Sequence, residues 1–177
     1  MARKFTGSFT QQEGLSQEAI AAAVAVLQSG RLHRYNLAPG EAGEAAQLEA
    51  EYRDWQGSGY CLAVTSGGQA LQIALRACDV ASGDKVLTNA YTLAPVPGAI
   101  RAVGAETVLV EIDEDLRLDL DDLDAKIASS GARVLLLSHM RGHLCDMDRL
   151  MAICNGAEVT VIEDCAHTMG AQWNCIR

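Results

Sequence analysis

The stretch Val159-Thr160-Val161-Ile162-Glu163-Asp164-Cys165-Ala166-His167 decides the fold class of this chain. Residues 159–162 form a short, mostly apolar run, and the acidic pair Glu163-Asp164 follows it directly. A run of this kind is typical of a strand that is buried on both faces, as strands of parallel sheets are. Polar residues directly after such a strand indicate a ligand site, because open α/β sheets bind ligands at the carboxyl ends of their strands.

Similar apolar runs recur upstream and alternate with helical patterns. We predict strands at 61–65, 85–88, 107–112, 134–138 and 159–164, separated by helices at 69–77, 95–103, 119–129 and 147–154. The alternation favours right-handed crossovers and a largely parallel sheet. The predicted fold class is therefore α/β, a three-layer structure with a mostly parallel sheet and helices on both of its faces.

The first 57 residues differ from this pattern. Ser16 is a suitable cap for a helix that ends at Gly30, a residue that terminates helices well. A second helix is expected at 44–55, with large apolar side chains on one face. We predict an N-terminal segment of helices and a loop at 1–57, followed at 58–177 by the first part of a ligand-binding large domain that is truncated.

The composition is typical of a soluble globular protein. The chain has 177 residues, of which 49% are hydrophobic and 21% charged, and its formal net charge is −9. This acidity, without any lysine/arginine cluster, argues against nucleic acid as a partner. The sequence has no run of about 18 apolar residues that would span a membrane. It also has no secretory signal, so we expect a cytoplasmic protein with no membrane partner.

The six cysteines are expected to be reduced rather than paired in disulfides. Four of them lie in or beside apolar segments, where cysteine behaves as a small buried hydrophobe: Cys61, Cys78, Cys154 and Cys165.

The turn Ser66-Gly67-Gly68 joins a predicted strand to a helix. Small residues at a helix N-terminus let backbone N–H groups approach an anion closely, and a phosphate is the expected ligand. The alternative is a plain glycine turn. The dinucleotide motif G-x-G-x-x-G and the P-loop motif G-x-x-x-x-G-K-[ST] are both absent from the sequence.

Two other strand ends carry candidate ligand residues. Asp164 is suited to pair with a protonated ring nitrogen or a metal, and the alternative is a helix-capping aspartate. The acidic pair also resembles that of P-loop ATPases, but the phosphate-binding lysine of those enzymes is missing. Tyr91, which follows the strand at 85–88, either stacks on a flat ring or packs with its hydroxyl group exposed.

The loop at 138–146 contains His139, His143 and Cys145. These residue types are zinc ligands, but their spacing fits no ordinary ligand set. A substrate-facing or structural loop at a strand end is the favoured interpretation.

In order and spacing, these motifs together resemble the sugar aminotransferases of the DegT–StrS group, which depend on pyridoxal 5'-phosphate (PLP) and have the aspartate-aminotransferase fold (fold type I). The resemblance runs from about residue 16 to residue 174. It implies cofactor contacts for six residues: Ser66, Gly67, Gly68, Tyr91, Asp164 and His167.

The resemblance also assigns a role to each of these residues. The turn at 66–68 would bind the cofactor phosphate through backbone amides, although Gly68 replaces the family's threonine and loses its hydroxyl group. Tyr91 would stack on the pyridine ring and Asp164 would pair with the pyridine nitrogen. His167 would lie near the phenolate oxygen of the cofactor or near the substrate.

The imine-forming lysine of the family is expected beyond residue 177. None of the three lysines, Lys4, Lys85 and Lys126, occupies a matching position. We therefore expect an N-terminal portion without a catalytic residue of its own. PLP is the expected cofactor of the full-length protein, and the alternative for this portion alone is that it does not bind PLP. The complete enzyme would be a homodimer that transfers an amino group from a small donor to a nucleotide-linked keto sugar or a cyclitol. The alternative is a non-catalytic fragment or pseudoenzyme that retains only phosphate or PLP binding, or an interaction role.

Overall fold

The computed structural model describes residues 12–35 and 37–174. The chain divides into two compact units, Met1–Leu48 and Glu49–Arg177, with the division inside helix α2 (Glu44–Gln56). The predicted domain boundary after residue 57 stays a prediction. Among the described helices, none is both long enough and apolar enough to cross a membrane.

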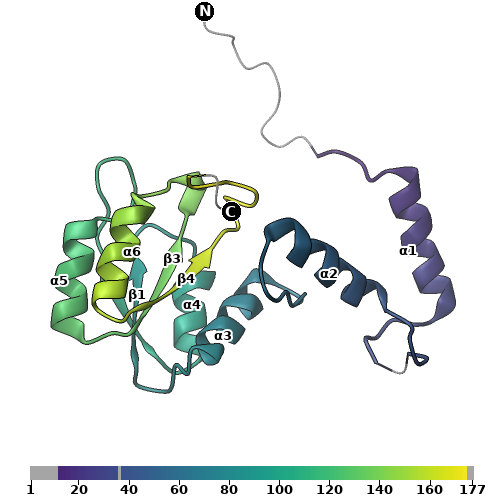
Figure 1. The fold of residues 1–177 in the computed structure, drawn as a ribbon, viewed down its shortest axis with the longest axis horizontal. Coiled ribbons are helices and arrows are strands. Elements are labelled where there is room, and N and C mark those ends of the chain that lie inside the picture. Colours follow the sequence, from purple (N-terminus) through teal and green to yellow (C-terminus); the bar gives the residue numbers. More distant parts are fainter. Residues whose placement is uncertain (1–11, 36, 175–177) are drawn as a thin grey trace, which may run out of the picture. The chain divides into compact units, whose positions relative to one another are not determined.

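A parallel sheet of four strands forms the centre of the second unit (Figure 1). The strands lie in the order β2-β1-β3-β4, and their bounds are β1 Lys85–Asn89, β2 Glu106–Val110, β3 Val134–Ser138 and β4 Thr160–Asp164. The chain passes from β1 to β2 on one side and then returns to place β3 on the other side of β1. The topology therefore reverses between β1 and β3, and open α/β sheets bind ligands at such a point.

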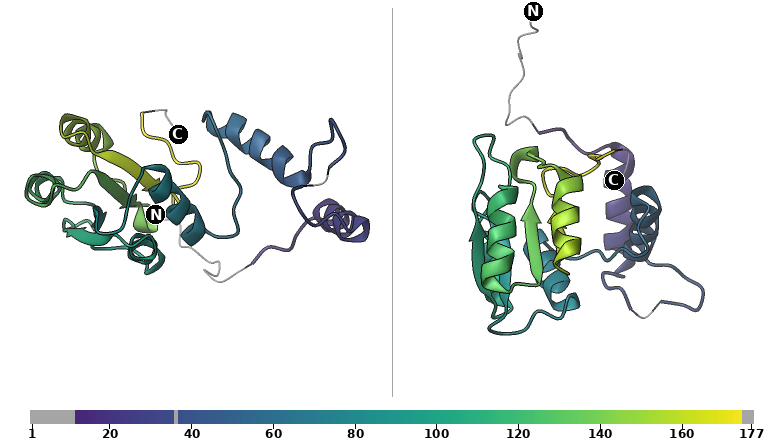
Figure 2. Two further views of the ribbon diagram at one scale, coloured as in Figure 1. Left: turned by 90° about the horizontal axis from the view of Figure 1, so that it is seen from below. Right: turned by 60° about the vertical axis from the view of Figure 1, so that its left-hand side comes forward.

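Helices cover both faces of the sheet, as the two views of Figure 2 show. One core cluster joins α3 (Gly67–Ala77) and α4 (Pro95–Ala102) to the sheet through residues that include Leu75, Ile100 and Leu136. The other joins α5 (Leu120–Ser130) and α6 (Met147–Gly156) to the opposite face. The predicted α/β fold with a parallel sheet between two helical layers is confirmed.

Side-chain alternation along β3 explains why both layers are held. Leu135 and Leu137 belong to the core under α5 and α6, whereas Leu136 belongs to the core under α3 and α4. All five residues of β3 are buried. Burying a leucine side chain contributes about 1.5–3 kcal/mol, so this central strand stabilises both layers at once.

The predicted strand at 61–65 is wrong: the described residues place no strand there. A strand needs a neighbour that accepts and donates its backbone hydrogen bonds, and no described strand pairs with this segment. The backbone N–H of Ala63 instead donates to Glu49 Oε1 at 2.7 Å. The segment has the composition of a strand but lacks the partner.

The five described cysteines are all free thiols, as predicted. Their burial matches the prediction in part. Cys154 is fully buried in the core and Cys61 and Cys78 are partly buried, but Cys165 is exposed. Cys165 is exposed because it lies in the turn that follows β4, beyond the sheet and its covering helices.

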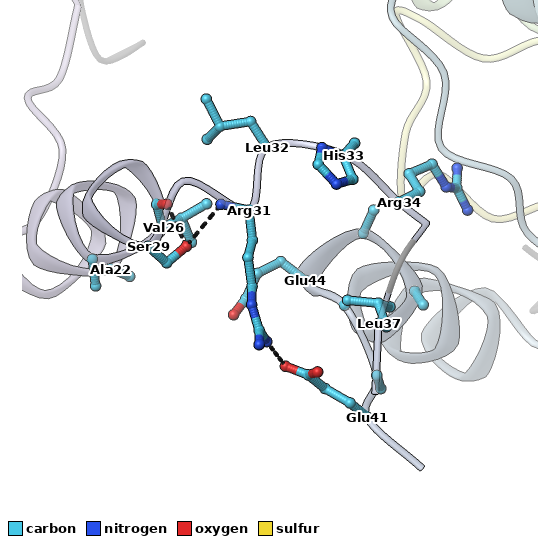
Figure 3. Close-up of a pocket in the computed structure, with 15 residues that line it drawn as sticks. Ala22, Val26, Ser29, Arg31, Leu32, His33, Arg34, Leu37, Glu41 and Glu44 are labelled. Atoms are coloured by element: carbon cyan, nitrogen blue, oxygen red, sulfur yellow. Dashed lines mark hydrogen bonds and ion pairs between the residues drawn. The ribbon is translucent and has the colours of Figure 1, made fainter. Parts of the chain in front are cut away.

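In the first unit, α1 (Gln17–Ser29) has the predicted caps: Ser16 Oγ accepts a hydrogen bond from Ala19 N, and Gly30 ends the helix with a left-handed φ of 69°. A cavity of about 600 Å³ lies between α1, the following loop and the start of α2. Figure 3 shows Arg31 reaching across it to an ion pair with Glu41. No sequence-predicted site residue lines this cavity.

Candidate functional site

The carboxyl ends of three neighbouring strands bring polar side chains to one edge of the sheet. Asn89 ends β1, Ser138 ends β3 and Asp164 ends β4. Ser138 and Asp164 are directly paired in the parallel register. Because the order of the strands reverses between β1 and β3, this edge is where the fold itself predicts a ligand.

Asp164 is held in a fixed orientation by two hydrogen bonds. Ser138 Oγ donates to Asp164 Oδ2 at 3.1 Å, and the backbone N–H of Ala166 donates to Oδ1 at 3.2 Å. A carboxylate has about four acceptor sites, so both oxygens keep acceptor capacity. Asp164 is only partly buried and can therefore accept a further hydrogen bond from a ligand.

Asn89 locks the two central strand ends together, a role that the sequence analysis missed. Its side chain accepts a hydrogen bond from Ser138 N at 2.9 Å and donates to Ser138 O at 3.1 Å. It also donates to the carbonyl oxygen of Tyr91 at 2.7 Å, which fixes the backbone after β1. Asn89 is 3% exposed. The sequence feature that could have identified Asn89 is a polar residue at the end of an apolar strand.

The turn before α3 exposes a helix N-terminus with little covering it. Ser66 Oγ caps the helix by accepting a hydrogen bond from Gln69 N at 3.2 Å. A Cβ atom added at Gly67 would meet nothing within 4 Å, and one at Gly68 would meet only Pro95 Cβ at 4.0 Å. The N-terminal amides of a helix carry partial positive charge, so this open turn suits an anion.

Tyr91 lies in the bend after β1 and is partly buried. Four residues later Pro95 begins α4, which packs against α3 and β1. Tyr91 thus lies between the end of β1 and the helix whose first residue adjoins Gly68.

His167 is exposed, and one of its ring nitrogens is engaged. Its Nδ1 accepts a hydrogen bond from the backbone N–H of Arg141 at 3.2 Å, which assigns the ring proton to Nε2. Arg141 lies in a short 3-10 turn (Met140–Gly142) and has a left-handed φ of 58°. The turn thus positions the imidazole so that Nε2–H can donate to a ligand.

A second polar pair lies on the opposite face of the same edge, because adjacent residues of a strand point to opposite faces. His139 Nε2 and Glu163 Oε2 are 2.8 Å apart. The hydrogen bond with His139 lowers the pKa of Glu163 below its ordinary value, against the effect of partial burial. This pair could not be predicted from the sequence, because only the parallel register brings the two residues together.

The structure does not assemble the zinc set considered for the loop at 138–146. His143 is exposed, whereas Cys145 is buried in the core, and this burial raises the pKa of its thiol to about 11. His139 instead lies with Glu163 and Cys165. The alternative of a structural loop therefore fits His143 and Cys145 better.

The residues of the predicted cofactor set fit a ligand with a phosphate and a nitrogen-containing ring. The open amides at Gly67 and Gly68 suit the phosphate, and the oriented Asp164 carboxylate suits a protonated ring nitrogen. The family model that matches residues 14–175 is that of the DegT/DnrJ/EryC1/StrS aminotransferases. The chain belongs to this aminotransferase family. Its match covers both units and every predicted cofactor residue.

Individual relatives agree with the family match. A dTDP-3-amino-3,6-dideoxy-alpha-D-galactopyranose transaminase from Aneurinibacillus thermoaerophilus is 35% identical over 133 residues, 75% of this chain and 36% of the relative. The structure of S. venezuelae DesV in complex with a ketimine intermediate has a TM-score of 0.77 and 31% identity, covering 90% of this chain and 43% of DesV.

A more distant structure supports the fold alone. It is the PLP-form of the putative sugar aminotransferase Spr1654 from Streptococcus pneumoniae, with a TM-score of 0.76 and 23% identity over 89% of this chain and 41% of that one. The chain thus spans about two fifths of the length of these relatives.

Proposed function

We propose that this chain carries the phosphate-binding and ring-binding part of the PLP site of a sugar aminotransferase. The observation that carries the proposal is the Asp164 carboxylate, oriented by Ser138 and Ala166 at the carboxyl edge of the sheet. When bound, PLP supplies an electron sink for the bond changes at the substrate carbon. The residues of this chain would bind and orient the cofactor.

Asp164 would keep the ring nitrogen protonated. An ionised carboxylate beside a protonated nitrogen favours the charged form of both groups. Because Ser138 and Ala166 each hold one oxygen of Asp164, the carboxylate would meet the ring without reorganising first. Pre-oriented groups of this kind lose less entropy on binding.

The amides of Gly67 and Gly68 would hold the phosphate, Tyr91 would pack on the ring, and His167 would donate Nε2–H to the phenolate oxygen or the substrate. The open space around both glycines and the ring proton assigned to Nε2 of His167 support these roles.

No described lysine is placed to attach the cofactor. Lys85 begins β1 and lies roughly 13 Å along the strand from Asn89, at about 3.3 Å per residue, and thus at the opposite edge of the sheet. Lys126 lies in α5, in the helical layer on the Glu163 face of the sheet. Lys4 lies outside the described residues. We therefore propose that the 177 residues alone bind PLP without a covalent bond and do not transfer amino groups.

For the whole protein we propose a cytoplasmic homodimer that aminates a nucleotide-linked keto sugar or a cyclitol. The division into a segment at 1–57 and the beginning of the large domain at 58–177 belongs to the same proposal. The sugar-nucleotide transaminase among the relatives supports the substrate class.

Lys85 lies at the edge of the sheet opposite the proposed cofactor site and so cannot attach PLP there. This favours a second candidate function for the isolated chain: a non-catalytic protein that keeps only PLP or phosphate binding, or an interaction role. The two candidates differ only in whether the activity of a complete enzyme depends on these residues. In a complete enzyme, Asp164→Ala should abolish turnover and leave folding intact.

The proposal is tested by adding PLP to the purified 177-residue chain, reducing with borohydride and digesting for mass spectrometry. We expect reversible PLP binding, no PLP-modified lysine and no amino-group transfer to a keto sugar. A lysine modified in stoichiometric yield, or measurable transfer, would refute the role proposed for the isolated chain.

A further inference from the structure

Beyond the proposed cofactor site, three ligand-type side chains meet on the opposite face of the same sheet edge. His139, Glu163 and Cys165 each bring one nitrogen, oxygen or sulfur ligand atom, and these atoms all lie within 4.8 Å of one another. Within the described residues, no other group of three or more histidine, cysteine or acidic side chains is arranged in this way.

All three residues line one cavity, of about 500 Å³, that lies within the second unit. Much of its remaining lining is apolar, including Met147, Met151 and Trp173. Burial of the three differs: the His139 side chain is 1% exposed, the Glu163 side chain is 47% exposed and Cys165 is exposed. A small solute therefore has access to the group through the cavity, whereas His139 is held inside the protein.

The polar atoms of this cavity are incompletely satisfied. His139 Nδ1 is buried without a hydrogen-bond partner among the described residues, and so is Trp173 Nε1. Buried polar atoms in native proteins normally have a partner, so each exception requires an explanation. A cation bound to His139 Nδ1 would give that nitrogen a partner, whereas a cation bound to Nε2 would leave Nδ1 to a water in the cavity.

The backbones of two of the ligand residues are fixed. Glu163 lies in β4, paired in register with Leu137 of β3. His139 directly follows β3, and its backbone N–H donates to Asp164 O at 3.2 Å. Cys165 follows β4 in a turn. A metal site needs ligands on rigid elements. The adjacent strands β3 and β4 hold the backbones of His139 and Glu163 in this way.

We propose that His139, Glu163 and Cys165 form a binding site for a zinc-class divalent cation, with water as the fourth ligand. Imidazole nitrogen, thiolate sulfur and carboxylate oxygen are the donors that zinc takes in proteins, and three protein ligands with one open position are common. The mixed soft and hard donors disfavour Mg²⁺ and Ca²⁺, which prefer oxygen alone.

The ligand atoms lie within 4.8 Å of one another, near the spacing of a zinc site, and their side chains must adjust to reach it. Zinc bonds of about 2.0–2.3 Å place tetrahedral ligand atoms roughly 3.3–3.8 Å apart. His139 Nε2 and Glu163 Oε2, at 2.8 Å, are closer than this, so the half-exposed Glu163 side chain must withdraw slightly if these two atoms are the ligands. The site lies on the face opposite Asp164 and does not use the proposed cofactor residues.

The test is a titration of the metal-free 177-residue chain with Co²⁺, without PLP, followed by absorption spectroscopy. We expect one equivalent to bind and to produce a thiolate-to-cobalt charge-transfer band that Zn²⁺ displaces. Cys165→Ser should remove the band. Glu163→Gln should weaken Co²⁺ binding by at least about tenfold. The matched control Cys78→Ser changes a partly buried thiol outside the site and should keep the band.

A second readout is thermal unfolding, in which Zn²⁺ should raise the midpoint of the unmodified chain but not that of Cys165→Ser. Circular dichroism checks the fold of Cys165→Ser, which we expect to be intact because Cys165 is exposed. The proposal is overturned if the unmodified chain shows no charge-transfer band, or if Cys165→Ser keeps it. Equal loss of the band in Cys78→Ser would overturn it as well.

Discussion

Ser138 donates its hydroxyl hydrogen to Asp164 Oδ2 over 3.1 Å, so the end of one strand orients the carboxylate at the end of its neighbour. The parallel register makes this contact, because it pairs Ser138 directly with Asp164. Ser138 therefore acts as a positioning residue for the proposed ring-binding carboxylate.

Removing this hydroxyl group should weaken PLP binding. In Ser138→Ala, Asp164 keeps only the hydrogen bond from Ala166, so its carboxylate must be ordered when the ligand binds. Ordering a side chain on binding costs about 0.5–1.5 kcal/mol, which corresponds to an affinity loss of about two- to tenfold. Fluorescence titration with PLP measures the affinity of Ser138→Ala and of the unmodified chain. Ser138→Thr, which restores a hydroxyl group, should recover most of the affinity, and no recovery would argue against positioning.

A hydroxyl group placed at Gly68 should strengthen the phosphate site. The added Cβ meets only Pro95 Cβ at 4.0 Å, so the first side-chain atom of Gly68→Thr has room. We expect PLP to bind up to about tenfold more tightly through one further hydrogen bond to a charged oxygen. Gly68→Val, of the same shape but without the hydroxyl group, is the control. Equal affinities of the two variants would contradict a phosphate contact at this position.

Loss of the Asn89 side chain should destabilise the sheet. Asn89→Ala leaves the backbone N–H and C=O of Ser138 without the partners that Asn89 provides. We expect the free energy of unfolding to fall by about 2–4 kcal/mol, measured by urea denaturation. Asn155→Ala, at an exposed position in α6, should change it by less than about 0.5 kcal/mol. Similar effects of the two substitutions would contradict the bridging role.

The buried Cys145 should resist alkylation in the native protein. Burial raises the pKa of its thiol to about 11, so at pH 8 only about one molecule in a thousand carries the reactive thiolate there. Because the pKa is raised, reactivity should appear only at much higher pH or after unfolding. Peptide mapping after iodoacetamide treatment measures this, with the partly buried Cys61 as the internal comparison. Rapid native labelling of Cys145 would contradict its burial.

Much of the fold could be predicted from local patterns. Apolar runs predicted the four strands, and Ser16 predicted a helix start, because capping depends on neighbours in the sequence. The segment 61–65 could not be judged in this way. A strand exists only through its hydrogen-bonded neighbour, and composition does not reveal whether one is available.

In the candidate site, too, residues marked by local sequence features could be predicted, whereas contacts between distant parts of the chain could not. Asp164 and the turn at Gly67-Gly68 could be identified because a strand end and a glycine turn are sequence features. The bridge from Asn89 to Ser138 and the contact of His139 with Glu163 depend on which strands are adjacent. Sequence separations of 49 and 24 residues, respectively, hide these contacts from any local pattern.

Binding of PLP by Asp164 is tested most directly by equilibrium dialysis. The affinity of the 177-residue chain for PLP is compared with that of Asp164→Asn and Asp124→Asn. Asp124 is an exposed carboxylate in α5 and serves as the control of equal charge change. We expect Asp164→Asn to bind PLP at least about tenfold more weakly, because a charge-assisted hydrogen bond is lost, and Asp124→Asn to bind like the unmodified chain. Equal affinity of all three proteins, or no measurable binding by the unmodified chain, would contradict this expectation.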